Sequence, residues 1–236
     1  MLYRMNFHLL TGLLIAAILA GCAAAPKTAT EQQPADGHGW HAVLLPGKEA
    51  TQYAWTVKDG REALLATSER SASMWRRKVA LPAAQLNEVQ FSWWVDDLID
   101  GAKLGEAELD DAPARVMLAF AGDVTRLPQR TRMMFELAEA LTGEAPPYAT
   151  LMYVWESSMP VGTVIIHPRT DRVRKIVVDS GPAHLRGWRD HRRDVAADFR
   201  LAFGEEPGSL VSVGVMTDSD NTRSRASAWY GPVTVD

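Results

Sequence analysis

The residues with the clearest chemical potential are oxygen-bearing side chains near the C-terminus. Residues 217–222, TDSDNT, bring together Asp218, Asp220 and Asn221. Such side chains could begin a Ca²⁺ site or hydrogen-bond sugar hydroxyls, since protein oxygen atoms bind both kinds of ligand. An EF-hand loop starting at Asp218 is excluded, because its sixth and twelfth residues are Arg and Trp, whereas the motif needs Gly and Glu. Turn chemistry accounts for the same residues, so we expect a hairpin connection here and no metal.

A second group of carboxylates lies in a long connection between two expected strands. Its acidic residues are Asp97, Asp100, Glu106, Glu108, Asp110 and Asp111. Two close carboxylates can raise one another's pKa and so supply the acid and the base of glycoside hydrolysis. The candidates for catalysis are therefore Asp96, Asp97, Asp110, Asp111 and Glu156. The alternatives are a solvated acidic loop, or an ion pair of Asp110 and Asp111 with Arg115 that pins the loop.

Residues 87–96, NEVQFSWWVD, combine an apolar face with a polar one. Strand alternation places Val89, Phe91, Trp93 and Val95 on one face, and Gln90, Ser92, Trp94 and Asp96 on the other. The second face, if concave, could stack a sugar ring on Trp94 and hydrogen-bond its hydroxyl groups. Alternatively, helices cover this face and bury Trp94 against Trp188. The candidate ligand-binding residues are Trp94, Asp96, Glu156, Asp218, Asp220 and Asn221.

Other reactive residue types form no recognisable site. His38 and His41 have a spacing found in some metal sites, but no third ligand is nearby. His191 falls on the apolar side of an expected helix, which favours a packed, hydrogen-bonded histidine. The sequence contains a single cysteine, Cys22, and neither a Gly-rich phosphate loop nor a G-x-S-x-G motif. We therefore expect no cofactor.

Period-two alternation of apolar and polar residues dominates the chain and predicts strands. The runs cover residues 51–57, 61–67, 73–81, 87–96, 114–121, 150–156, 162–167, 173–178, 210–216 and 226–235. So many strands are best buried as two packed sheets. Helical periodicity occurs only at residues 130–142 and 187–203, which end at Gly143 and Gly204. The predicted fold is a mainly β, jelly-roll-like two-sheet β-sandwich with two peripheral α-helices.

The N-terminal residues predict export and lipidation. Residues 1–21 contain Arg4 followed by an apolar run too short for a comfortable membrane span. The run ends in L-A-G-C, which resembles the bacterial lipobox and implies a diacylated Cys22 at the start of the mature protein. By the same resemblance, Ala23 favours an outer-membrane anchor that faces the periplasm. Residues 22–39 are a flexible tether, and residues 40–236 form one domain.

The overall charge argues against nucleic acid as a partner. The whole chain has a formal net charge of −4, and loss of Arg4 with the leader leaves 24 basic against 29 acidic residues. An acidic surface repels a polyanion.

Several motifs together resemble one bacterial family of exported proteins. They are W-W-V-D, D-D-A-P-A-R-V, Y-V-W-E, D-F-R-L-A-F-G, M-T-D-S-D-N-T and A-W-Y-G, spread over residues 93–231. This order resembles the domain of unknown function 3047 (DUF3047), and the resemblance covers nearly all of residues 40–235. It implies no established activity. The last two expected strands also look like the closing hairpin of galactose-binding-type jelly-roll carbohydrate-binding modules, over about 25 residues.

These observations favour an envelope lipoprotein with a non-catalytic, ligand-binding β-sandwich, and the ligand best suited to it is a glycan. One alternative is a hydrolase or lyase that acts on envelope polysaccharide through the acidic residues named above. Another is a scaffold that binds a second envelope protein through the arginine-rich helix at residues 187–203. Fold alone does not choose among them, since sandwiches host all three.

The anchor is tested by Cys22→Ser. We expect this variant to lose labelling by an alkyne fatty acid and to leave the membrane fraction, because the thiol is the only site for the lipid. Unchanged labelling of the variant would disprove lipidation at this residue.

Overall fold

Two β-sheets make up most of the domain. A computed structural model describes residues 39–236. In spatial order, sheet A contains β1 (Trp40–Leu44), β4 (Ser73–Leu81), β11 (Leu210–Met216), β6 (Arg115–Phe120), β7 (Ala149–Glu156), β9 (Val173–Ser180) and β8 (Val164–Ile166). Sheet B contains β10 (Trp188–Asp194), β5 (Glu88–Val95), β12 (Arg225–Tyr230), β3 (Arg61–Glu69) and β2 (Gln52–Lys58), and β13 (Thr234–Val235) pairs with β5. Most neighbours are antiparallel, but β7 and β9 are parallel.

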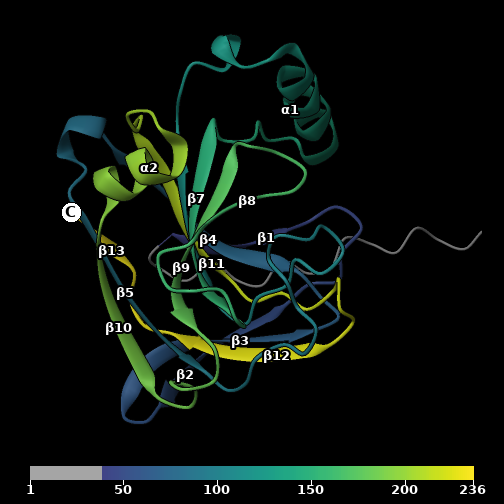
Figure 1. The fold of residues 1–236 in the computed structure, drawn as a ribbon, viewed down its shortest axis with the longest axis vertical. Coiled ribbons are helices and arrows are strands. Elements are labelled where there is room, and N and C mark those ends of the chain that lie inside the picture. The colour runs from purple at the N-terminus through teal and green to yellow at the C-terminus, as the bar shows by residue number, and fades with distance from the viewer. Residues whose placement is uncertain (1–38) are drawn as a thin grey trace, which may run out of the picture. The chain divides into compact units, whose positions relative to one another are not determined.

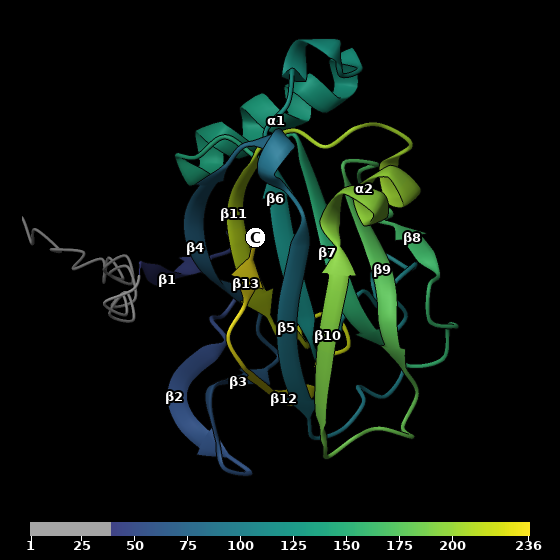
Figure 2. The ribbon, with the colours of Figure 1, turned by 90° about the vertical axis from the view of Figure 1, so that its left-hand side faces the viewer.

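The sheets pack face to face around one main apolar core, with sheet B toward the viewer in Figure 2. The predicted core face of β5 is buried, since Phe91 is 3% exposed and Trp93 is not exposed at all. From sheet A, Tyr153 and Trp155 of β7 meet these residues. The predicted class, a mainly β jelly-roll-like sandwich with two helices, is confirmed.

The first helix forms where the sequence predicted it and is peripheral, as expected. Helix α1 (Gln129–Thr142) ends at Gly143, which adopts the left-handed conformation. None of its residues is buried, and Leu137 and Leu141 are 61% and 68% exposed. Figures 1 and 2 show α1 beyond the upper ends of the strands. Two short 3₁₀ turns, η1 (Ala83–Gln85) and η2 (Val124–Arg126), complete the helical elements of residues 39–236.

The prediction of a second helix over residues 187–203 is wrong for the first half of that segment. Strand β10 occupies that part and pairs with β5. Helix α2 (Val195–Phe203) follows, and Asp194 caps its N-terminus by accepting a 2.8 Å hydrogen bond from the Ala197 N–H. The inward side chains of β10 are charged or polar, so no apolar alternation signals a strand. Arg189 and His191 both bond to Asp179 of β9. His191 is nevertheless packed and hydrogen-bonded, as predicted, between rings of β5.

The C-terminal strands also differ from the prediction. Strand β1 was not anticipated, and residues 226–235 form two strands separated by Gly231, where a Cβ atom would collide with the Ser92 side chain. The connection from β11 to β12 passes from sheet A to sheet B, so it is not a hairpin. Tyr230 lies in the core and Trp229 on the outer face of β12, as alternation predicted.

The predicted leader, the lipidation site Cys22 and nearly all of the tether lie outside the described residues. Within residues 39–236, no helix is long and apolar enough to cross a membrane.

Candidate functional site

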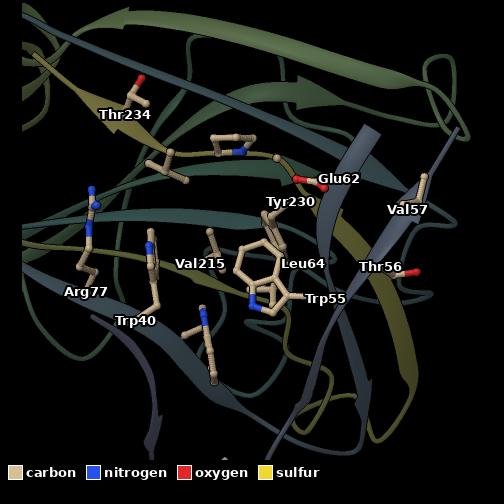
Figure 3. Close-up of a pocket in the computed structure, with 14 residues that line it drawn as sticks. Trp40, Trp55, Thr56, Val57, Glu62, Leu64, Arg77, Val215, Tyr230 and Thr234 are labelled. Carbon is tan, nitrogen blue, oxygen red and sulfur yellow. The ribbon is translucent and has the colours of Figure 1, made fainter. Parts of the chain in front are cut away.

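A cleft lies between the two sheets at their β2 and β1 side (Figure 3). It has a volume of about 850 Å³. Its lining comprises Trp40, Trp55, Thr56, Val57, Glu62, Leu64, Trp75, Arg77, Val215, Tyr230, Gly231, Pro232, Val233 and Thr234. This volume lies within the range of small-molecule sites, which is about 300–1,000 Å³. We refer to it as the inter-sheet cleft.

The cleft exists because β2 bends away from sheet A. Tyr53, Trp55 and Val57 share the inner face of β2, yet their exposed fractions are 7%, 60% and 64%. Tyr53 still stacks on Trp75 of the opposite sheet, with ring centroids 5.5 Å apart. Beyond this contact the sheets separate, and Figure 2 shows β2 curving outward. Trp55 therefore presents its indole to the cleft.

The floor of the cleft is apolar and its walls are mixed. Leu64, Val215 and Tyr230 are buried core residues. On the wall formed by sheet A, Trp40 and Arg77 are cross-strand partners, and the guanidinium carbon lies 5.4 Å from the centroid of the Trp40 ring.

Two buried hydrogen-bond donors at the cleft have no acceptor within residues 39–236. They are Trp75 Nε1 and Arg77 Nε, both on residues of β4 that line the cleft. A buried donor without a partner costs about 1–3 kcal/mol, so these atoms favour a ligand that brings acceptor oxygens. Glu62 supplies a carboxylate on the opposite wall, across the strand pair from Val57.

None of the ligand-binding residues predicted from the sequence lines this cleft. Trp94 is 5% exposed and lies on the outer face of sheet B. Its indole N–H donates to Asp59 Oδ2 at 3.0 Å, and Lys58 Nζ lies 3.6 Å from its ring centroid. The turn between β2 and β3, and not a helix, therefore covers it. Trp188 is its cross-strand partner on β10 and donates to the Lys58 carbonyl oxygen.

The structure also separates the other predicted partners of Trp94. Asp96 follows β5 of sheet B, is exposed and lies 3.6 Å from Arg186. Glu156 ends β7 of sheet A, is 3% exposed and accepts hydrogen bonds from the Ser158 and Met159 N–H groups. Asp97 is exposed on the following loop. These carboxylates form no shared groove with Trp94.

The remaining acidic candidates belong to a buried charge network on the outer face of sheet A. Arg115 of β6 donates to both oxygens of Asp218, at 2.8 and 2.9 Å, and to Asp110 at 3.2 Å. Lys175 of β9, which is fully buried, pairs with the same Asp110 at 2.5 Å. The predicted ion pair between Asp110 and Arg115 is thus present, and the loop at residues 97–113 is not simply solvated.

Asp111 and Asp220 complete the surroundings of Asp218. Carboxylate oxygens of Asp111, Asp218 and Asp220 lie within 4.8 Å of one another, which is the geometry of a possible cation site. The sequence could not name Asp111 as the third member, because it comes from a distant loop. Each carboxylate already has a donor, however. Asp111 accepts from the N–H groups of Asn221 and Thr222, and Asp220 pairs with Lys48.

Burial shifts the pKa values in this network in different directions. Burial raises the pKa of Asp218 to about 6, although Arg115 acts against it. Burial alone would also raise the pKa of Asp110, but Arg115 and Lys175 hold that pKa below its ordinary value. Burial, and then the charge of Arg115, lower the pKa of Lys175 to about 8. Burial and Lys175 lower the pKa of the neighbouring His167 to about 4.

Little in the local sequence points to the cleft. Tyr53, Trp55 and Val57 alternate like any core-facing strand residues, and only the bend of β2 exposes two of them. The sequence contains eight tryptophans, and nothing local distinguishes Trp55 from the buried ones.

Comparison with known proteins identifies a family and similar folds. Residues 38–234 match the family described as "Protein of unknown function (DUF3047)". A search of curated proteins finds no match. Endoglucanase Cel12A from Rhodothermus marinus has a TM-score of 0.47 and 11% identity, over 87% of this chain and 94% of that one. A family 11 carbohydrate-binding module from Clostridium thermocellum, in complex with a mixed-linked tetrasaccharide, has a TM-score of 0.40 and 8% identity, over 84% and 88%. We transfer no residue role from such distant similarities.

The network predicts the response to calcium. Adding millimolar Ca²⁺ should leave the melting temperature unchanged, because a cation would have to displace Arg115 and Lys48 from the carboxylates. EDTA should likewise have no effect in a thermal melt. A calcium-dependent rise that disappears in Asp218→Ala/Asp220→Ala would show that the three carboxylates bind the ion.

The lowered pKa of Lys175 predicts a pH dependence of stability. The folded pKa is about 8 and the ordinary value is 10.5, so between these values the unfolded chain binds more protons at this site. Stability from this group therefore rises with pH across that window, by about 3 kcal/mol at most. Urea denaturation measures the free energy of unfolding at pH 7.5 and at pH 10. Between these two pH values, this free energy should increase less, or decrease more, for Lys175→Met than for the wild type. Equal pH dependence in both proteins would contradict the shift.

Proposed function

We propose that this chain, which belongs to the family described as "Protein of unknown function (DUF3047)", is a glycan-binding, non-catalytic lipoprotein of the bacterial envelope. The inter-sheet cleft is its ligand site. The observation that carries the proposal is the exposed indole of Trp55 opposite two buried donors without protein acceptors.

The two kinds of group in the cleft match the two kinds of surface on a sugar. The C–H face of a pyranose ring packs on an aromatic face, and Trp55 offers one that is 60% exposed. Hydroxyl or carboxylate oxygens of the same ring can accept from Trp75 Nε1 and Arg77 Nε, while Glu62 can accept from hydroxyl groups. A purely apolar ligand would leave these donors unsatisfied.

The arrangement of carboxylates favours binding over hydrolysis. Glycoside hydrolysis generally uses two carboxyl groups on either side of the scissile bond. Among the described residues that line the cleft, Glu62 is the only carboxylate. Outside it, Asp110 and Asp218 already bond to Arg115, and Glu156 bonds to backbone N–H groups. The hydrolase alternative therefore lacks a pair of available carboxylates at this site.

The scaffold alternative relied on an exposed arginine-rich helix. Most of those arginines lie on β10, where Arg189 pairs with Asp179, Arg192 with Glu88 and Arg193 with Asp198. The expected arginine face of a helix is therefore not formed.

The location is part of the same proposal. A lipid on Cys22 and a tether over residues 22–39 would hold the domain at the outer membrane, facing the periplasm, where envelope glycans are within reach. Trp40, which directly follows the expected tether in the sequence, lines one wall of the cleft.

Trp55→Ala tests the cleft. We expect glycan affinity to fall at least tenfold, or about 1.4 kcal/mol, because a central tryptophan often dominates binding. The melting temperature should change little, since the side chain is mostly exposed. Isothermal titration calorimetry against a panel of envelope glycans measures the effect.

Met133→Ala is the matched control, because Met133 is also 60% exposed but lies on α1, away from the cleft. If the wild type binds a glycan and Trp55→Ala binds it with the same affinity, the cleft is not the glycan site. A reducing-end assay on the same panel looks for turnover, and its detection would favour the hydrolase instead.

A further inference from the structure

A second groove lies on the outer face of sheet A, on the side of β4 opposite the inter-sheet cleft. It has a volume of about 390 Å³. Its lining comprises Met74, Arg76, Lys78, Met117, Ala119, Glu144, Ala145, Pro147, Thr150, Met152, Val173, Val211, Ser212 and Gly214. Strand alternation separates the two sites, because Arg76 faces this groove and Arg77 faces the cleft. We refer to it as the methionine groove.

The register of the sheet explains why the surface is hollow there. Two rows of directly opposed residues cross β4, β11, β6 and β7. They are Arg76, Gly214, Met117 and Met152 in one row, and Lys78, Ser212, Ala119 and Thr150 in the other. Gly214, Ser212 and Ala119 are small and leave the surface low, while the longer Arg76 and Lys78 rise beside them on β4. The segment from Glu144 to Pro147, which follows α1, closes one rim.

The floor suits a flexible apolar chain better than a sugar. Met117 and Met152 face each other across β6 and β7, and Met74 lies on the β4 side. Methionine side chains adapt to irregular apolar ligands, and the volume is within the usual range of about 300–1,000 Å³ for ligand sites. No aromatic residue is among the described residues that line this groove, in contrast to the cleft.

One side of the groove is cationic and incompletely paired. Arg76 donates to Glu144 Oε2 at 2.6 Å, and Lys78 Nζ lies 3.3 Å from the other oxygen of the same carboxylate. Two positive charges thus share one negative charge. Arg76 Nε is buried and has no acceptor within the described part of the chain. A ligand with a carboxylate would neutralise the excess charge and satisfy this donor.

We propose that the methionine groove binds a free fatty acid, with its chain over the methionines and its carboxylate at Arg76 and Lys78. This site is independent of the glycan site, since a different face of β4 and a different set of side chains form it.

Titration of the full chain with dodecanoate, followed by native mass spectrometry from a non-ionic detergent, tests the proposal. We expect a stoichiometric complex whose affinity falls at least tenfold in Arg76→Gln. Arg77→Gln is the matched control, because the neighbouring side chain faces the other way and should leave dodecanoate binding unchanged. Dodecyltrimethylammonium, which has the same chain and the opposite charge, should not bind.

Ser212→Leu provides a second variant that leaves the cations in place. Its larger side chain should fill the groove and abolish dodecanoate binding, while thermal melting verifies that the protein is folded. The proposal fails if the wild type does not bind dodecanoate, if Arg76→Gln and Ser212→Leu both bind it like the wild type, or if the cationic probe binds equally well. If the wild type does not bind dodecanoate and Arg76→Gln loses glycan binding, the methionine groove is instead the sugar site.

Discussion

The buried guanidinium of Arg115 holds the outer face of sheet A together. It joins Asp218, at the end of β11, to Asp110, in the long loop after β5, and Lys175 reaches the same Asp110 from β9. Two positive and two negative charges are balanced in a region with little access to water. Such a network adds less to stability than its short distances suggest, because each charge has lost its hydration. It does fix the position of two irregular connections that no strand pairing would otherwise hold.

The network packs one part of the outer face of sheet A, while two other parts of the sandwich are concave. Near Arg115, the loop at residues 97–113 buries Leu104 and Ala112 in a cluster with Val154 of β7 and Val177 of β9. The sheets separate at β2, and next to the network, on the same outer face of sheet A, small residues hollow the surface between β4 and β7. Both candidate ligand sites therefore share β4 as a wall, and its adjacent arginines serve opposite faces.

The sequence predicted most strands because their apolar and polar residues alternate. The prediction failed at β10, where Arg189, His191 and Arg193 point inward and pair with Asp179 and Asp198. Charged residues are normally expected at exposed positions, so these side chains gave no sign of a strand with a buried face. The sequence also could not distinguish the roles of Trp55 and Trp94, since exposure depends on the bend of a strand and on a turn that folds over its neighbours. Both are tertiary effects that leave no local signal.

The turn that covers Trp94 has a consequence for the inter-sheet cleft on the other side of the sheet, the proposed ligand site. Trp94 and Trp188 hold the tip of the β2–β3 hairpin through bonds to Asp59 and the Lys58 carbonyl oxygen. The same hairpin carries Trp55, so the strand that presents the exposed indole is already fixed before any ligand arrives. The conformational entropy of ordering that strand is lost during folding and need not be lost again on binding. A buried tryptophan on one face thus preorganises an exposed tryptophan on the other.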